Sequence, residues 1–106
     1  MNNSIEIIDR RRKVMLGQRI QELRFGCGWS QVEVAKRLQV TKQTVSNWEN
    51  GNIQPSIDML IRLAHLFHVS TDYLLGMEDV PRLSVDGLPS DFVAHLALLI
   101  EDYRNK

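Results

Sequence analysis

The chain has 106 residues, of which 43% are hydrophobic, and this suits one compact domain with an appendage. Its single cysteine, Cys27, excludes an intrachain disulfide framework, and no apolar run approaches the roughly 20 residues of a transmembrane helix. The net charge is zero, yet residues 10–48 carry nine lysines and arginines against two glutamates, whereas residues 77–106 carry three against six acidic residues. This asymmetry suggests a polyanionic partner for the basic segment and a different role for the acidic one.

The first residues, MNNSIEIIDRRRK, lack the apolar core and cleavage site of a signal peptide. We therefore expect a cytoplasmic protein with no membrane association. The cationic run Arg10, Arg11, Arg12 and Lys13 has two interpretations: an arm or helix start that binds nucleic-acid phosphates or the minor groove, or a solvated charge run at the start of the chain. Phosphate contacts would make binding salt-dependent.

Helical spacing begins with Leu16, Ile20, Leu23 and Cys27, which step by four, three and four residues, and Gly26 and Gly28 then end this segment. We expect Cys27 to be a small, buried or half-buried apolar residue.

Two short helices with clear start signals follow. Ser30-Gln-Val-Glu33 has the pattern of a capping box, which predicts a helix over 31–38. Thr41 opens the next helix, over 42–50, and Gly51 ends it. In that second helix we expect an inner face of Val45 and Trp48 and a polar outer face of Lys42, Gln43, Ser46, Asn47 and Asn50.

Two helices joined by a short turn have the helix-turn-helix layout, in which the second helix can enter a major groove about 12 Å wide. The polar outer face suits such a role because amide side chains make paired contacts with adenine and lysine donates to guanine.

Ser56, after Pro55 and before Asp58, opens a fourth helix with a stripe formed by Ile57, Leu60, Ile61, Leu63, Ala64 and Phe67 or Leu66. Thr71-Asp72 opens a fifth, and Gly76 ends it. No alternating strand pattern persists. The sequence therefore predicts an all-α fold in which about five short helices form a bundle over 1–76.

The segment 77–89, with two prolines and a glycine, is typical of a linker. Over 90–106, a helix carries an apolar stripe of Phe92, Leu96, Leu99, Ile100 and Tyr103, which Val93 and Ala97 widen, with Leu98 nearly opposite. A helix this apolar requires cover. We expect homodimerisation through it; the alternative is packing onto its own domain as a sixth helix.

The segments SQVEVAKRLQVTKQTVSNWENG and PSIDMLIRLAHLFHVSTDYLLG resemble the DNA-binding domain of the Xre family, the group that contains the lambda-type phage repressors and Cro. The resemblance covers roughly residues 16–76 at many fixed spacings. It implies a lambda-repressor-like five-helix domain that binds a double-stranded DNA operator, usually as a dimer.

Carried over position by position, the resemblance implies that Lys42, Gln43 and Asn47 contact base edges, and that Ser46 contacts bases or phosphates. Thr44 and Asn50 would contact phosphates, and Gln31 would contact a phosphate and support Gln43. Arg24 and Glu49 would form a structural pair that ties the recognition helix to the first helix. One departure is Gln39, which stands where the family usually has a glycine in a left-handed conformation.

The sequence gives little support for metal binding or catalysis. His65 and His68 are three residues apart, but no cysteine or acidic cluster completes a metal site, and nothing sets a nucleophile beside a base. We expect no enzyme activity and no cofactor. Three hypotheses remain: a transcriptional repressor, which a regulatory protein partner, proteolysis or dilution of a weak dimer would relieve; an antitoxin that also regulates its own operon; or an interaction module that has lost DNA binding. The polar outer face of Lys42, Gln43 and Asn47 argues against the third.

Overall fold

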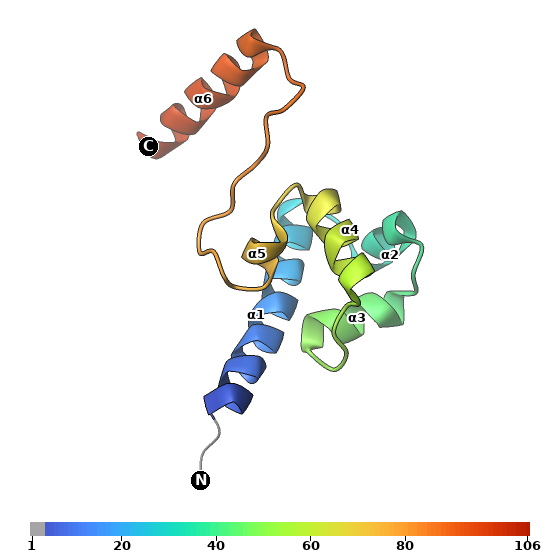
Figure 1. Ribbon diagram of the computed structural model, residues 1–106. Coiled ribbons are helices and arrows are strands. Elements are labelled where there is room, and N and C mark those ends of the chain that lie inside the picture. Colours follow the sequence, from blue (N-terminus) through green and yellow to red (C-terminus); the bar gives the residue numbers. More distant parts are fainter. Residues whose placement is uncertain (1–3) are drawn as a thin grey trace.

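The computed structural model describes the backbone of residues 4–106 and the side chains from residue 15 onward. Over this range the chain forms six helices and no strand, which confirms the all-α prediction (Figure 1). The helices are α1 (Ser4–Gly26), α2 (Gln31–Leu38), α3 (Lys42–Asn50), α4 (Ile57–Phe67), α5 (Thr71–Leu74) and α6 (Ser90–Arg104).

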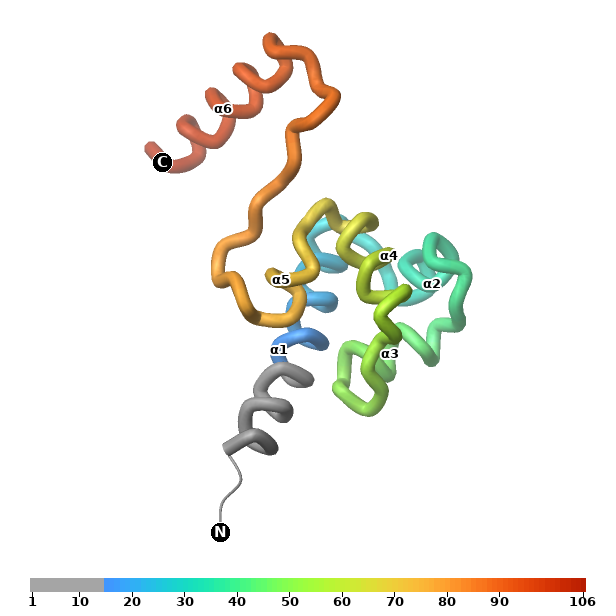
Figure 2. Tube along the Cα trace, in the orientation of Figure 1, coloured from blue at the N-terminus to red at the C-terminus, as the bar shows by residue number. Residues whose placement is uncertain are grey.

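The cationic run of the N-terminal segment falls within the range of α1. The side chains of Arg10, Arg11, Arg12 and Lys13 lie outside the described residues (Figure 2). Both interpretations of this run therefore stay predictions.

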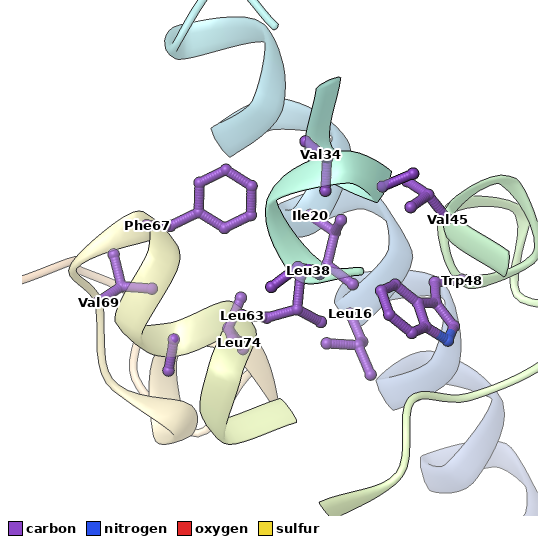
Figure 3. Close-up of a cluster of buried hydrophobic side chains, with 12 residues drawn as sticks. Leu16, Ile20, Val34, Leu38, Val45, Trp48, Leu63, Phe67, Val69 and Leu74 are labelled. Atoms are coloured by element: carbon purple, nitrogen blue, oxygen red, sulfur yellow. The ribbon is translucent and has the colours of Figure 1, made fainter. Parts of the chain in front are cut away.

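Helices α1 to α5 share one hydrophobic core (Figure 3). Ile20 of α1, Val34 of α2, Val45 of α3, Leu63 of α4 and Leu74 of α5 are each fully buried within it. Each of the five helices thus contributes at least one side chain to the same cluster, because its apolar residues recur at helical spacing. The ring of Trp29, between α1 and α2, packs at 6.0 Å from that of Phe67.

Four helix starts are capped by hydroxyl side chains. Ser30, Thr41 and Ser56 cap α2, α3 and α4 as the sequence predicts, each accepting a backbone N–H three residues later. The cap of α5 is Ser70, one residue before the Thr71 start signal. Pro89 occupies the N-cap position of α6 and makes no side-chain cap bond.

The expected burial of Cys27 was wrong, and two members of the predicted stripe of α4 are exposed. Cys27 is exposed because it follows the last residue of α1 and lies in the turn rather than on the buried face of the helix. Ile57 is 77% exposed and Ile61 42% exposed. The buried face of α4 is formed by Leu63, Ala64 and Phe67, and at 100° per residue both isoleucines fall beyond the edge of that face.

Close backbone packing joins α1 to α3. A Cβ atom built on Gly17 would lie 2.5 Å from the carbonyl oxygen of Glu49 and 2.7 Å from that of Trp48. Only glycine therefore permits this approach, and it brings the end of α3 directly onto α1.

Segment 77–89 leads away from the bundle, and α6 stands apart from α1–α5 (Figure 1). The radius of gyration is 16.1 Å, whereas one compact domain of this length has about 13 Å. No residue of α6 is buried, so the structure does not pack this helix onto its own domain as a sixth member of the bundle. Among the described residues, no helix combines the length and apolar character needed to cross a membrane.

Candidate nucleic-acid interface

Helices α2 and α3 are joined by the three residues Gln39, Val40 and Thr41. Gln39 adopts the left-handed conformation, with φ 58° and ψ 43°, as its position in the family pattern implies. The N–H of Val40 donates to the carbonyl oxygen of Ala35 at 2.9 Å, and that of Gln39 donates to Lys36 at 3.3 Å. These bonds close the end of α2 and reverse the chain, so α3 begins immediately afterwards.

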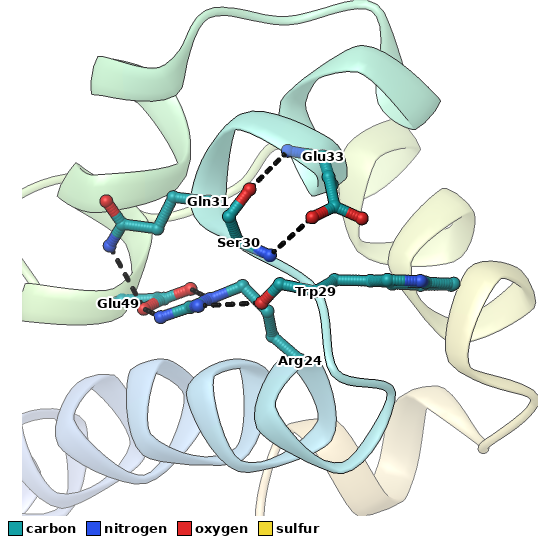
Figure 4. Close-up of polar contacts among 6 residues, drawn as sticks. All are labelled: Arg24, Trp29, Ser30, Gln31, Glu33 and Glu49. Atoms are coloured by element: carbon teal, nitrogen blue, oxygen red, sulfur yellow. Dashed lines mark hydrogen bonds and ion pairs between the residues drawn. The ribbon is translucent and has the colours of Figure 1, made fainter.

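The start of α2 is fixed by the capping box that the sequence predicts (Figure 4). The N–H of Glu33 donates to Ser30 Oγ at 3.1 Å, and the N–H of Ser30 donates to Glu33 Oε1 at 3.3 Å. This reciprocal pair satisfies two backbone groups that would otherwise lack partners. It sets the position of Gln31, the first residue of the helix.

Helix α3 is anchored by two buried side chains, as predicted. Val45 has no exposed surface and Trp48 is 4% exposed, and both lie in the core shared with α1 and α2. Their spacing of three residues orients the helix, because it leaves the opposite face of the cylinder away from the core. The structure thus fixes which side of α3 can meet another molecule.

The outward side of α3 is polar. Lys42, Gln43 and Asn50 are exposed, and Ser46 and Asn47 are half-buried. Gln43 Nε2 donates to Asn47 Oδ1 at 3.1 Å, which joins two of the proposed base-contacting amides one helical turn apart. The sequence did not predict this bond. It holds both amide planes in a defined orientation and leaves donors and acceptors unused on their outer edges.

Two further residues of α3 are held by local contacts. Thr44 Oγ1 lies 2.8 Å from Thr41 Oγ1, at the start of the helix. Asn50 Oδ1 accepts the N–H of Asn52 at 2.9 Å, so the amide nitrogen of Asn50 keeps both of its donors. Thr44 lies between Gln43 and Ser46, and Asn50 is the last residue of α3.

Arg24 and Glu49 form the predicted pair and do so in bidentate geometry (Figure 4). Arg24 Nε donates to Glu49 Oε2 at 2.7 Å and Nη2 donates to Oε1 at 2.9 Å, while Nη1 donates to the carbonyl oxygen of Trp29 at 3.0 Å. The two side chains are only 8% and 4% exposed. The hydrogen bond to Glu49 raises the pKa of Arg24 above its ordinary value, although burial opposes this shift.

Gln31 joins this pair rather than Gln43. Its Nε2 donates to Glu49 Oε1 at 3.2 Å, while the amide of Gln43 bonds to Asn47. The described contacts of Gln31 therefore give no direct support to Gln43. They connect the start of α2 to the end of α3 through one carboxylate that serves three donors. The sequence pattern had no signal for this third donor, because the contact depends on how α2 and α3 pack.

No group of three or more histidine, cysteine, aspartate or glutamate side chains suited to a metal ion occurs among the residues that the structure describes.

A capped helix, a tight turn and an anchored second helix with a polar outer side define a helix-turn-helix DNA-binding domain. The family model HTH_3, described as helix-turn-helix, matches residues 20–74, more than half of the chain. The chain belongs to this family, and its helix-turn-helix is of the Xre/Cro type. The family is one of DNA-binding transcriptional regulators.

Curated relatives carry the same kind of description. The HTH-type transcriptional regulator ImmR of Bacillus subtilis is 40% identical over 67 residues, which are 63% of this chain and 53% of ImmR. The HTH-type transcriptional activator BcrR of Enterococcus faecalis is 31% identical over 67 residues, which are 63% of this chain and 33% of BcrR. The chain spans about half of the length of the first curated relatives that it matches.

Solved structures share the fold. A hypothetical transcription factor, NHTF, from Neisseria matches with a TM-score of 0.57 and 23% identity, over 66% of this chain and 76% of its own. A transcriptional regulator from Listeria innocua matches with a TM-score of 0.55 and 24% identity, over 85% of this chain and 92% of its own.

Proposed function

We propose that this chain is a sequence-specific, double-stranded-DNA-binding transcriptional regulator that acts as a homodimer on an inverted-repeat operator and is a repressor. The observation that carries this proposal is the polar outer side of α3. Lys42 and Gln43 are exposed there, while Val45 and Trp48 fix the helix from within. A surface of this kind is suited to base edges in the major groove.

In this proposal Lys42, Gln43, Ser46 and Asn47 read bases. The bond between Gln43 and Asn47 restricts both side chains before DNA arrives, so less conformational entropy is lost on binding. Either amide can present a donor and an acceptor together to an adenine, and Lys42 can donate to a guanine.

Phosphate contacts would come from both ends of the motif. Thr44 lies among the base-reading side chains of α3, Asn50 is the last residue of that helix, and Gln31 is the first residue of α2. The free amide donors of Asn50 suit a phosphate oxygen. Arg10, Arg11, Arg12 and Lys13 would add contacts whose number sets the salt dependence, each neutralised phosphate contributing about −0.9 to the log–log slope.

The dimer would form through α6. Four members of its apolar stripe are largely exposed: Phe92 at 48%, Leu99 at 66%, Ile100 at 51% and Tyr103 at 77%; the fifth, Leu96, is half-buried. Leu99, Ile100 and Tyr103, with Arg104, line a hollow of about 460 Å³. A symmetric pairing would bury this stripe against its own copy. We propose that residues 1–76 are the DNA-binding domain, 77–89 the linker and 90–106 the oligomerisation helix.

Such a dimer would present two recognition helices about 34 Å apart to two half-sites related by a two-fold axis. Occupation of an operator that overlaps a promoter would exclude RNA polymerase, which is the simplest route to repression. This role places the protein in the cytoplasm, where the chromosome is. A partner protein that competes for α6 would separate the dimer and lift repression.

A second candidate is an antitoxin that regulates its own operon. The observation that favours it is Leu98, which is 61% exposed and lies nearly opposite the stripe. A two-helix pairing covers one face of α6, so Leu98 would remain available to a second protein.

The experiment that tests the proposal is selection of bound sites from a random duplex library, followed by affinity measurements at two salt concentrations. We expect enrichment of an inverted repeat whose half-sites lie about one helical turn apart. Weak, salt-sensitive binding with no enriched sequence would contradict a sequence-specific regulator and would shift attention to α6 and a protein partner.

A further inference from the structure

A second surface of the domain contains a hollow with a polar lining that the proposed operator contacts do not use. A hollow of about 480 Å³ lies at the end of α4, where the chain passes into α5, and Arg82 and Ser84 of segment 77–89 line it as that segment leaves the domain. Its floor is formed by Ala64 and Val69, and its polar lining by His65, His68, Ser70, Arg82 and Ser84. None of these residues belongs to α2 or α3.

The wall that segment 77–89 contributes is anchored to the domain. Arg19 of α1 donates to the carbonyl oxygen of Glu78 at 2.8 Å and also donates to that of Tyr73, over whose ring its guanidinium lies at 4.1 Å. Ser70 Oγ donates to the carboxylate of Glu78 at 3.1 Å. The beginning of the segment is thereby fixed beside α5, four residues before Arg82.

The charged side chains that line this hollow and its neighbour are arginines, and therefore cationic. Arg82 and two imidazoles line the hollow, and His65 also lines a neighbouring hollow of about 370 Å³ with Arg37 and Arg62. Among the residues that the structure describes, no aspartate or glutamate lines either hollow. The carboxylate of Glu78 accepts from Ser70, a residue of the lining. Cationic and hydroxyl groups above an apolar floor match an anion that carries a small apolar group.

We propose that this hollow binds a small phosphate monoester with an apolar or aromatic substituent. The phosphate presents three acceptor oxygens, and the lining offers a guanidinium, two imidazoles and the hydroxyl group of Ser84, since the hydroxyl hydrogen of Ser70 is already donated to Glu78. A carboxylate ligand, which has only two oxygens, would use fewer of these donors than a phosphate. The volume lies within the range of small-molecule sites, about 300–1,000 Å³.

Ligand binding in this hollow would affect operator binding because Arg82 belongs to the segment that leads to α6. A ligand held between Arg82 and the imidazoles would fix the path of this segment and hence the direction in which α6 leaves the domain. This consequence rests on the proposed function, since it assumes that α6 joins two DNA-binding domains. Binding of the ligand does not rest on it and is tested first.

Ligand binding can be measured through the NMR signals of the histidines. The chain has three: His65 and His68 line the hollow, and His95 lies on α6 and serves as an internal reference. We would titrate the full chain with phenyl phosphate, inorganic phosphate and benzoate and follow the imidazole NMR signals. We expect His65 and His68 to shift saturably with His95 unchanged, and phenyl phosphate to bind more tightly than either other probe. Benzoate binding as tightly as phenyl phosphate, or equal shifts of all three histidines, would overturn the proposal.

Two variants sharpen the test without threatening the fold. Arg82→Gln removes an exposed cation, and we expect phenyl phosphate to bind about tenfold more weakly or worse. His68→Gly removes an imidazole at a left-handed position (φ 56°), where glycine is the easier residue, so the melting temperature should not fall while binding weakens. Arg104→Gln on α6 makes the same charge change away from the hollow, and an equal loss there would overturn the proposal.

Operator affinity is measured last, with and without saturating phenyl phosphate. A ligand-dependent change that Arg82→Gln abolishes supports the regulatory consequence. Saturable binding with no effect on operator affinity would overturn that consequence alone, and absence of an operator would refute the proposed function while the titration still decides the site.

Discussion

Residues 15–76 and residues 77–106 differ in how far their apolar side chains are buried. The first part joins α1 to α5 around one core in which side chains from every helix meet. The second part has no buried residue in α6 and leaves Phe92, Leu98, Leu99, Ile100 and Tyr103 open to solvent. Both parts contain amphipathic helices. The apolar faces of α1 to α5 pack on one another, whereas no residue of α6 is buried. The first part forms its own core, whereas the apolar stripe of α6 stays exposed, and in our proposal a second copy of the chain covers it.

The two parts also differ in what they leave uncovered. The outer side of α3 is polar and its side chains are partly fixed by hydrogen bonds, which suits a hydrated nucleic-acid groove. The uncovered side of α6 is apolar, which suits a protein interface core. Each of the following predictions separates one part from the other, beginning with the largest expected effect.

The variant Glu49→Ala should damage the first part alone. It leaves the buried guanidinium of Arg24 without its carboxylate and removes the acceptor of Gln31. Breaking a buried pair costs about 3–5 kcal/mol, a large share of a domain's total stability. Chemical denaturation should show this loss in the unfolding of the domain, while the self-association of α6 is retained in molecules that remain folded.

The matched control is Glu22→Ala, which removes an exposed glutamate of α1. We expect a melting temperature close to that of the parent chain. In a second comparison, Arg24→Met with Glu49→Leu replaces both charges by apolar groups and should recover most of the stability. If Glu49→Ala unfolds at the same denaturant concentration as Glu22→Ala, the pair does not hold α3 on α1.

The variant Leu96→Asp should damage the second part alone. A symmetric interface would contain two such carboxylates, and their desolvation should weaken the dimer about 100-fold or more. Analytical ultracentrifugation should show a monomer that binds a single half-site weakly, with the melting transition of the domain unchanged. Leu98→Asp makes the same change nearly opposite the stripe and should leave the dimer intact. A Leu96→Asp protein that still dimerises would exclude this helix face as the interface.

Gly17→Ala tests how closely the first part is packed. The added methyl group would meet two backbone carbonyl oxygens of α3, which cannot rotate away. Overpacking of this kind costs about 1–3 kcal/mol, occasionally more. Gly26→Ala is the matched control in the same helix, because its Cβ would meet nothing within 4 Å, and it should preserve or raise stability. Equal unfolding midpoints for the two variants would mean that α1 and α3 do not approach this closely.

Gln43→Ala addresses the polar surface of the first part. It removes one amide of the Gln43–Asn47 pair, and we expect a loss of about 1–3 kcal/mol at the selected operator with little change on nonspecific DNA. The exposed Gln21→Ala on α1 is the control and should bind both DNAs as the parent does. An equal loss on every DNA sequence would rule out base reading by Gln43.

The sequence predicted correctly those features that one short segment or the family motif determines. The capping box at Ser30, the anchors Val45 and Trp48 and the pair Arg24–Glu49 all follow from short-range patterns or from the family motif. Helix starts, helix faces and the turn at Gln39 are local properties, so their residues specify them directly.

The features that were missed depend on how helices meet. The requirement for glycine at Gly17 comes from the backbone of α3, and the bond from Gln31 to Glu49 comes from the packing of α2 on α3. Ile57 and Ile61 follow the period of α4 but lie beyond its buried face, and period alone does not set the width of that face. The contact of Arg19 with Glu78 spans 59 residues and had no signal in either segment.

The smallest expected effect concerns the turn that sets the entire motif. Gln39 occupies the left-handed region, which costs a non-glycine residue about 1 kcal/mol. Gln39→Gly should therefore raise stability by up to about 1 kcal/mol, reduced in part by the greater freedom of glycine in the unfolded chain. Gln39→Ala keeps the backbone cost and should give no gain, so the two variants separate conformation from side-chain contacts. Their denaturation midpoints should differ while the dimer of α6 is the same in both. A gain shared equally by Gln39→Ala would place the cost in the glutamine side chain rather than in the left-handed backbone, and would remove the physical reason for the family's glycine at this turn.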